Sequence, residues 1–168
     1  DLSRNEYDAE RTLILSTVYH EEKEVLRWIP LGDNAELQVM RVEFPPSLDF
    51  GPFSVLAPEW ELPTQVLTQS IRGAFLESVQ RPAYGEVSLV GLSRMLPIIV
   101  ETTYVAKGEL LMARSCYSIT FDISISNREA TPPHVMYRSA ILVSHVPNLP
   151  VTYLDEIWEE QIATMQLA

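Results

Sequence analysis

The chain has 168 residues, 46% of them apolar, and a formal net charge of −11 at pH 7 from 23 acidic and 12 basic residues. This length and composition fit one domain with a sizeable core. The charge argues against a general nucleic-acid binder, because phosphate contacts draw on clustered Lys and Arg. For the same reason, contact of this acidic chain with an anionic membrane has only weak support. No stretch approaches the roughly 20 apolar residues of a membrane span.

The single cysteine, Cys116, excludes an internal disulfide framework and favours an intracellular, reducing compartment. The chain begins at Asp1 without a starting Met or a signal-peptide pattern, as expected for the edge of a fragment. We expect a single globular domain over residues 1–168, with residues 1–11 as a candidate extended arm.

The first part of the chain predicts three strands. Residues 12–19 and 25–29 are β-branched and apolar, and the charged run 20–24 connects them. After a turn at 30–34, residues 35–44 alternate between two faces. The alternation places Leu37 and Val39 on the face opposite Met40, Val42 and Phe44.

Residues 45–63 are rich in proline and in apolar side chains, and the prolines argue against a helix or a central strand. An apolar loop of this length has two explanations: it covers one end of the core, or it forms a contact surface. On the second explanation, the candidate protein-interface residues are Phe50, Phe53, Leu56 and Trp60.

Two helices are predicted next. Residues 64–80 carry a buried stripe at helical spacing, after a proline suited to a first helical turn: Leu67, Ile71, Ala74, Phe75 and Ser78. Ser88 can cap a second, shorter helix over 88–96, whose buried face would be Leu89, Leu92 and Leu96.

Strands dominate the rest of the chain. Residues 98–105 and 109–126 are predicted strands joined by a tight turn at 106–108, and 135–146 is a final strand. Within 116–126 the alternation is strict, so Ile119, Phe121 and Ile123 should be buried and Ser118, Thr120 and Asp122 much more exposed.

A C-terminal helix over residues 152–165 completes the pattern, with Leu154, Ile157, Trp158, Ile162 and Met165 on one face. The predicted class is α+β: an antiparallel sheet of five or six strands, with two central helices and the C-terminal helix packed on it.

The residue patterns predict no catalytic site, metal or cofactor. His20, His134 and His145 have no metal-ligand spacing, and there is no phosphate-binding loop. A nucleophilic pair of Cys116 with His134 or His145 across a hairpin stays open, since Cys116 lies on the polar side of its strand.

The order of elements resembles the globular core of rhabdovirus-type matrix proteins. The resemblance rests on residues 37–44, the helical pair 64–80 and 88–96, the strands over 98–126 and the helix over 152–165. It implies a small non-enzymatic protein that self-associates, bridges a membrane envelope and a nucleocapsid, and resides in the host cytoplasm or the virion. The basic arm and proline-tyrosine motif usual in such proteins are not in this chain.

Three functions therefore remain open. The leading one is a structural protein that self-associates and binds other proteins, with no direct nucleic-acid contact. The second is a domain that binds a small apolar ligand or a peptide, and the third is an enzyme with an unrecognised pocket.

Overall fold

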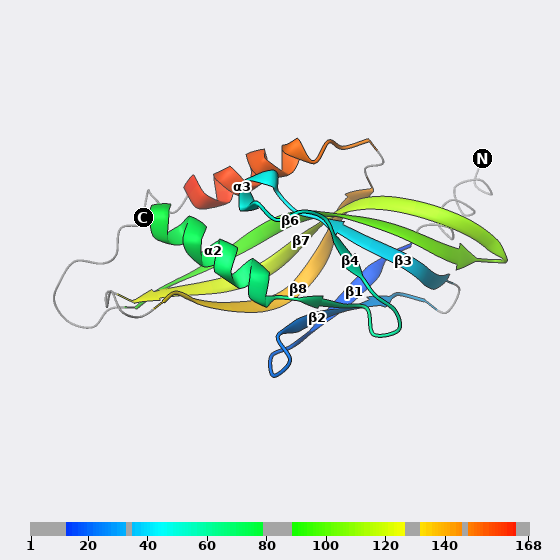
Figure 1. Cartoon of the computed structure of the whole chain (residues 1–168), viewed down its shortest axis with the longest axis horizontal. Coiled ribbons are helices and arrows are strands. Elements are labelled where there is room, and N and C mark those ends of the chain that lie inside the picture. The colour runs from blue at the N-terminus through cyan, green and yellow to red at the C-terminus, as the bar shows by residue number, and fades with distance from the viewer. Residues whose placement is uncertain (1–12, 33–34, 79–88, 127–131, 146–147, 164–168) are drawn as a thin grey trace.

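The computed structural model describes residues 13–32, 35–78, 89–126, 132–145 and 148–163. The predicted arm over 1–11 lies outside these residues. The described elements, in chain order, are β1 (Leu15–His20), β2 (Val25–Pro30), β3 (Ala35–Glu43), the short 3₁₀ helix η1 (Pro46–Leu48), β4 (Phe53–Val55), β5 (Glu61–Pro63), α2 (Gln65–Ser78), β6 (Leu89–Ala106), β7 (Glu109–Ser126), β8 (His134–His145) and α3 (Thr152–Ala163) (Figure 1).

The fold is α+β, as predicted, but the strands form two antiparallel sheets instead of one. The larger sheet has the order β4-β3-β6-β7-β8 and the smaller one β1-β2-β5. The centre of the larger sheet is the hairpin of β6 and β7, whose strands have 18 residues each. Its predicted tight turn is confirmed: Lys107 and Gly108 both have positive φ, which suits the right-handed twist of the flanking strands.

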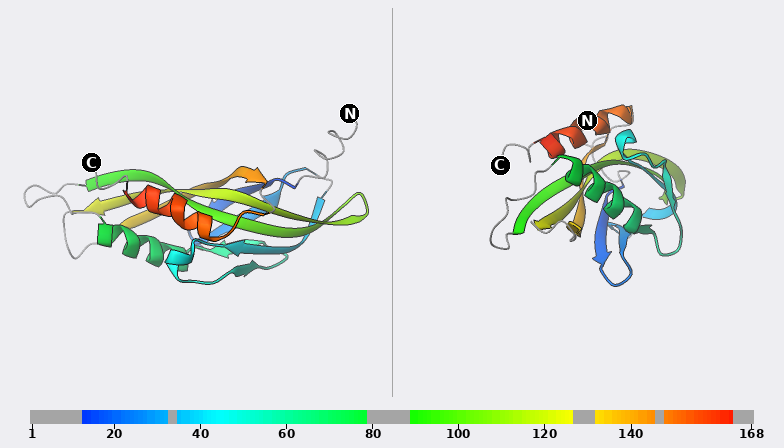
Figure 2. Two further views of the ribbon diagram at one scale, coloured as in Figure 1. Left: turned by 90° about the horizontal axis from the view of Figure 1, so that it is seen from above. Right: turned by 60° about the vertical axis from the view of Figure 1, so that its left-hand side comes forward.

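The smaller sheet packs on one face of the larger sheet, which we call the inner face. The Leu15 N–H donates a hydrogen bond of 3.0 Å to the Tyr117 hydroxyl, and the Tyr19 and Tyr137 rings lie 5.5 Å apart. At one edge of the larger sheet, Thr17 Oγ1 accepts a 2.7 Å hydrogen bond from the Ala140 N–H. The two sheets therefore enclose one core and form a partly closed shell (Figure 2).

Helix α2 covers the remainder of the inner face. Its predicted stripe is confirmed for Leu67, Ile71 and Phe75, which are buried, and the Phe75 ring meets Phe121 at 6.0 Å. Ala74 is half-buried. Beyond Ser78, the predicted end of the helix at residue 80 lies outside the described residues.

The predicted second helix over 88–96 is wrong, because the chain from Leu89 onward is strand β6. Leucines at this spacing fit a helix, but here Leu92 and Leu96 lie opposite Ile123 and Ile119 of β7. Pro97 is tolerated inside the strand because β3 begins to pair with β6 only at Ile99, so among the described strands this part of β6 has a neighbour on one side only.

Helix α3 lies along that open edge of β6. The Met95 N–H donates to Gln161 Oε1 and Arg94 Nε donates to the Gln161 carbonyl, both at 3.1 Å. Trp158 joins the inner core, whereas Leu154 packs on Ile99 and Cys116 of the opposite, outer face. The helix therefore contacts both faces of the sheet at this edge. Met165, which was expected on the buried face of the helix, lies outside the described residues.

The predicted burial of the alternating strand holds for its apolar side. Ile119, Phe121 and Ile123 are buried, and Thr120 and Asp122 are half-buried. Ser118 was expected to be exposed, which is wrong: it is 9% exposed, because the bulkier Pro97 and Ile141 flank this small side chain on the neighbouring strands.

Strand β3 contains a β-bulge between Leu37 and Val39 that changes its predicted faces. The extra residue shifts the alternation by one position, so Leu37 is buried on the inner face together with Met40 and Val42. Val39 points outward instead and is 56% exposed. The expectation that Leu37 and Val39 share a face is therefore wrong.

The proline-rich segment 45–63 contains more regular structure than expected. Strands β4 and β5 fall within it, each only three residues long and each at the edge of its sheet. Edge positions accommodate proline because one side of the strand needs no hydrogen-bond donor. The prediction that this segment forms no central strand is confirmed.

Candidate functional site

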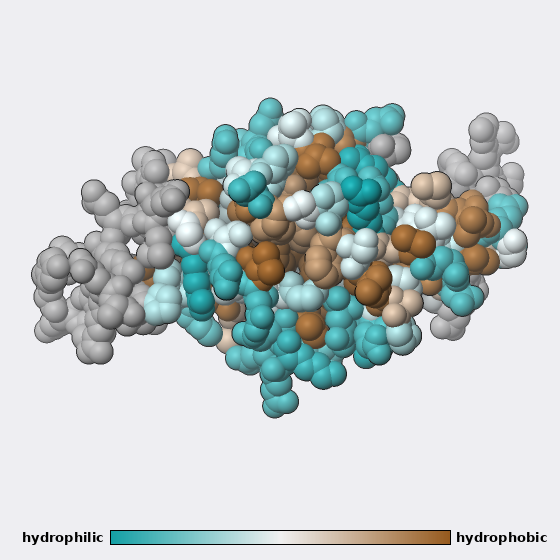
Figure 3. Space-filling model, in the orientation of Figure 1, coloured by the Kyte–Doolittle hydropathy of each residue, from teal (hydrophilic) through white to brown (hydrophobic). Residues whose placement is uncertain are grey.

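An apolar surface lies on the outer face of the larger sheet, toward the tip of the β6–β7 hairpin. The strand register aligns Val39, Thr103 and Met112 in one row across three strands, and Val105 and Leu110 in the next row. Met112 is 84% exposed and Leu110 68%. Hydrophobic side chains are also prominent around the hairpin tip in the space-filling view (Figure 3).

Leu56 extends this surface by one strand. Val55, the last residue of β4, pairs with Met40, and Leu56 follows directly after it. Leu56 is 72% exposed. We call the set Val39, Leu56, Val105, Leu110 and Met112 the distal apolar patch.

Charged side chains border the patch on the side nearer the middle of the sheet. Arg114 lies 3.1 Å from the Glu101 carboxylate and 3.8 Å from that of Glu43, which also lies 3.7 Å from Arg41. A shallow depression of about 410 Å³ separates this ion network from the patch; it is lined by Val39, Arg41, Glu101, Thr103, Met112 and Arg114.

The balance of charge around the patch differs from that of the whole chain. The outer-face rows that contain and border the patch carry two basic side chains, from Arg41 and Arg114, and three acidic ones, from Glu36, Glu43 and Glu101. Their sum is −1, against −11 for the chain. Repulsion between two copies of this protein is therefore weaker here than over the acidic remainder of the surface.

The structure separates the four predicted interface residues. Leu56 belongs to the distal apolar patch, and Phe53 is 39% exposed at the β4 edge. Phe50 is half-buried against the Phe44 ring, at a centroid distance of 4.7 Å. Trp60 packs against the core, and its carbonyl accepts a 2.9 Å hydrogen bond from the backbone N–H of Trp28. Phe50 and Trp60 thus have structural contacts within their own domain.

Residues 109–113 supply the part of the patch that sequence reasoning missed. Apolar side chains occupy both faces of the strand there, with Leu110 and Met112 outside and Leu111 half-buried inside. The sequence signal was the apolar run 110–113, which makes both faces of the strand apolar, but it does not say which face is left uncovered.

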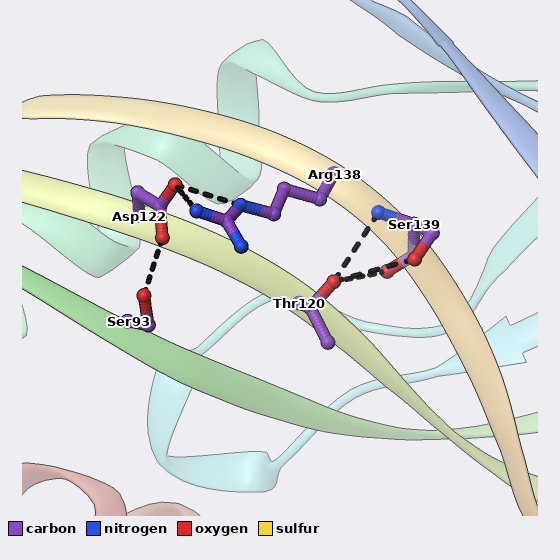
Figure 4. Close-up of polar contacts among 5 residues, drawn as sticks. All are labelled: Ser93, Thr120, Asp122, Arg138 and Ser139. Atoms are coloured by element: carbon purple, nitrogen blue, oxygen red, sulfur yellow. Dashed lines mark hydrogen bonds and ion pairs between the residues drawn. The ribbon is translucent and has the colours of Figure 1, made fainter.

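A polar cluster occupies the outer face toward the opposite end of the sheet (Figure 4). Asp122 accepts hydrogen bonds from the Ser93 hydroxyl at 2.6 Å and from Arg138 Nε at 2.8 Å, and Thr120 contacts Ser139. The Ser93 bond, aided by Arg138 and opposed by partial desolvation, holds the pKa of Asp122 below its ordinary 3.8. The Asp122 carboxylate therefore links β6, β7 and β8 through its hydrogen bonds. Because its pKa is lowered, it holds a proton weakly and is a poor general base.

Cys116 does not form the predicted pair with His134 or His145. Cys116 was expected to be accessible, which is wrong: Leu154 covers it, and burial raises the pKa of its thiol. Its neighbour on β8 is Ser144, while His134 lies opposite Ser124. His145 Nδ1 instead lies 2.6 Å from the Ser115 hydroxyl. Ser115 is buried, and among the described residues no carboxylate orients the imidazole, as a catalytic pair requires.

Comparison with family models, with curated proteins and with solved structures found no match to this chain. In the part of the chain that the structure describes, no group of three or more His, Cys, Asp or Glu side chains is placed to hold a metal ion. No helix within those same residues is long and apolar enough to cross a membrane.

Proposed function

We propose that this protein is a non-enzymatic structural protein that self-associates through the distal apolar patch. The observation that supports the proposal is the exposure of Met112 and Leu110 on one sheet surface, with the exposed Leu56 directly after the edge strand β4. Contiguous exposed apolar surface of this kind marks interaction sites in soluble domains. Its location on a rigid, hydrogen-bonded sheet favours a flat protein partner over a small ligand.

The proposed partner is a second copy of the same chain. A two-fold interface brings each surface against itself, so it needs both signs of charge within one patch. Arg41 and Glu101 supply them, and they lie opposite one another in the strand register. Because the local charge is close to neutral, this surface is also where two strongly acidic chains repel each other least.

A matrix-like role, bridging a membrane envelope and a nucleocapsid, is the finer part of this proposal. It derives from the resemblance in element order, from which the helix over 88–96 must now be removed. Self-association supports such a role because a bridging layer must first form contacts between its own subunits. Binding of a small apolar ligand is the alternative function.

The test is the mass of the protein in solution, measured by sedimentation over a range of concentrations. Met112→Asp places a charge in the centre of the patch, and Met136→Asp is the matched control on the outer face of β8. Along β7, Met112 and the residue opposite Met136 are roughly 33 Å apart. Only Met112→Asp should weaken association.

The expected loss is at least about a hundredfold in the dimerisation constant. Burial of one methionine side chain contributes about 1.5–3 kcal/mol, and a two-fold interface contains the side chain twice. At concentrations where the parent is monomeric, the melting temperatures of both variants should match the parent. A parent that stays monomeric at every accessible concentration, or equal effects of the two substitutions, would remove the patch as the association surface.

A further inference from the structure

A second groove lies between α2, α3 and η1, at the end of the molecule away from the distal apolar patch (Figures 1 and 2). It has a volume of about 370 Å³, and its apolar lining comes from Leu48, Ala74, Trp158 and Ile162. Gly73 forms part of one wall, and a Cβ atom built on it would meet no atom within 4 Å. The groove is therefore open above Gly73.

One acidic side chain lines this groove, and others follow it along α3. Glu159 lines it, and α3 also carries Asp155, Glu156 and Glu160 but no basic residue. Asp155 is engaged, since its carboxylate accepts a 2.9 Å hydrogen bond from the Ser47 N–H of η1. Glu156, Glu159 and Glu160 are exposed.

The helix dipoles add to this negative potential. Helices α2 and α3 run in the same general direction, so their C-terminal ends lie toward the same end of the molecule (Figures 1 and 2). Neither helix has a basic residue in its last turn. Acidic side chains near a helix C-terminus are unfavourable, and a cation bound there would offset both the side-chain charges and the dipoles.

We propose that this groove binds a basic amphipathic helix of a partner protein. The apolar stripe of that helix would lie on Trp158, Ala74 and Ile162. Its Lys or Arg side chains would face Glu159, the acidic residue of the groove lining, and the neighbouring Glu156 and Glu160 would add to the negative potential along α3. Grooves of this type bind apolar side chains that are spaced three or four residues apart on a helix. Charged residues at the rim determine the direction in which that helix binds. The acidic rim disfavours an acidic segment by the same electrostatics.

The experiment uses fluorescence anisotropy of a labelled synthetic helix with leucine on one face and lysine on the other. A matched peptide carries glutamate in place of lysine. Gly73→Trp fills the groove, and Gln65→Trp is its control at the exposed first residue of α2, about two turns away from Gly73. Glu159→Gln/Glu160→Gln removes rim charge, and Glu21→Gln/Glu22→Gln removes the same charge from the β1–β2 turn.

The lysine peptide should bind and the glutamate peptide should not. Gly73→Trp and the Glu159/Glu160 double variant should each weaken binding about tenfold or more, while both controls stay within about twofold of the parent. Equal loss in the two double variants would mean general attraction to an acidic chain and would overturn the proposal. Absence of binding, or full affinity in folded Gly73→Trp, would overturn it as well.

Two safeguards keep this test independent. If Gly73→Trp fails to fold, the comparison of the two double variants decides by itself. Met112→Asp should leave peptide affinity unchanged, because the groove and the distal apolar patch share no residue. A failure of self-association therefore does not affect the outcome for the groove.

Discussion

Trp28 of the smaller sheet meets Tyr117 of the larger sheet edge to face, with ring centroids 5.4 Å apart and planes at 85°. Both side chains are buried. Edge-to-face geometry places the positive rim of one ring against the negative face of the other, which adds to the burial energy. The Tyr117 hydroxyl also accepts the hydrogen bond from Leu15, so this tyrosine connects to two strands of the smaller sheet.

Tyr117→Phe should lower the free energy of unfolding by about 1–3 kcal/mol. The ring contact with Trp28 would persist, but the buried Leu15 N–H would lose its acceptor, and an unsatisfied buried donor costs about that much. Urea denaturation measures the effect, with Tyr153→Phe as the control at an exposed tyrosine. Equal stability of Tyr117→Phe and the parent would show that this hydrogen bond contributes nothing.

Phe121→Ala should destabilise the fold by about 3–5 kcal/mol, because a large cavity would open in the core. The Phe121 ring contacts Phe75 at 6.0 Å, Trp158 at 6.3 Å and Tyr137 at 6.4 Å, so it connects both helices with β8. Thermal melting provides the measurement. A variant that melts within about a degree of the parent would contradict the packing described here.

Two glycine substitutions should have opposite effects on stability. Gly73→Ala should stabilise by up to about 1 kcal/mol, because alanine favours the helix and its Cβ meets open space. Gly108→Ala should destabilise by a similar amount, because Gly108 has a φ of +74° in the hairpin turn. Chemical denaturation of both variants checks the pair. Effects of the same sign would contradict the assignment.

Asp122→Asn should reduce stability at neutral pH and lose its effect in acid. The pKa of Asp122 is lower in the folded chain than its ordinary 3.8, so the unfolded chain takes up the proton first. Its contribution is thus complete above pH 3.8 and declines as the pH falls through the folded pKa. Unfolding curves from pH 7 to pH 2 test this, with Asp49→Asn as an exposed control. A difference from the parent that is constant with pH would count against it.

Local patterns predicted the parts of the fold that depend on neighbouring residues. The alternation around Phe121 shows which side of a strand is apolar, and the spacing of Leu67 and Phe75 shows the same for a helix. These apolar side chains are buried. The turn at Lys107-Gly108 could be predicted because a short polar segment with a glycine lies between two strand patterns. Both turn residues have positive φ, as a tight hairpin turn requires.

Errors arose where partners distant in sequence decide the outcome. Leu92 and Leu96 fit a helix or a strand, and only the long pairing with β7 selects the strand. The bulge before Val39 changes a face without any glycine or proline to signal it. Likewise, Leu110 and Met112 became candidates only when the register placed them beside Val39 on an uncovered face.

The position of α3 on the open edge of β6 has a consequence for the order of synthesis. Gln161, which caps this edge, lies 67 positions after Arg94 in the chain. At ordinary translation rates the edge therefore stays uncovered for roughly 3 to 13 seconds after it is made. During that interval the unpaired N–H and C=O groups of β6 can form hydrogen bonds with another nascent chain. We therefore expect aggregation of this protein to be most frequent between chains on neighbouring ribosomes.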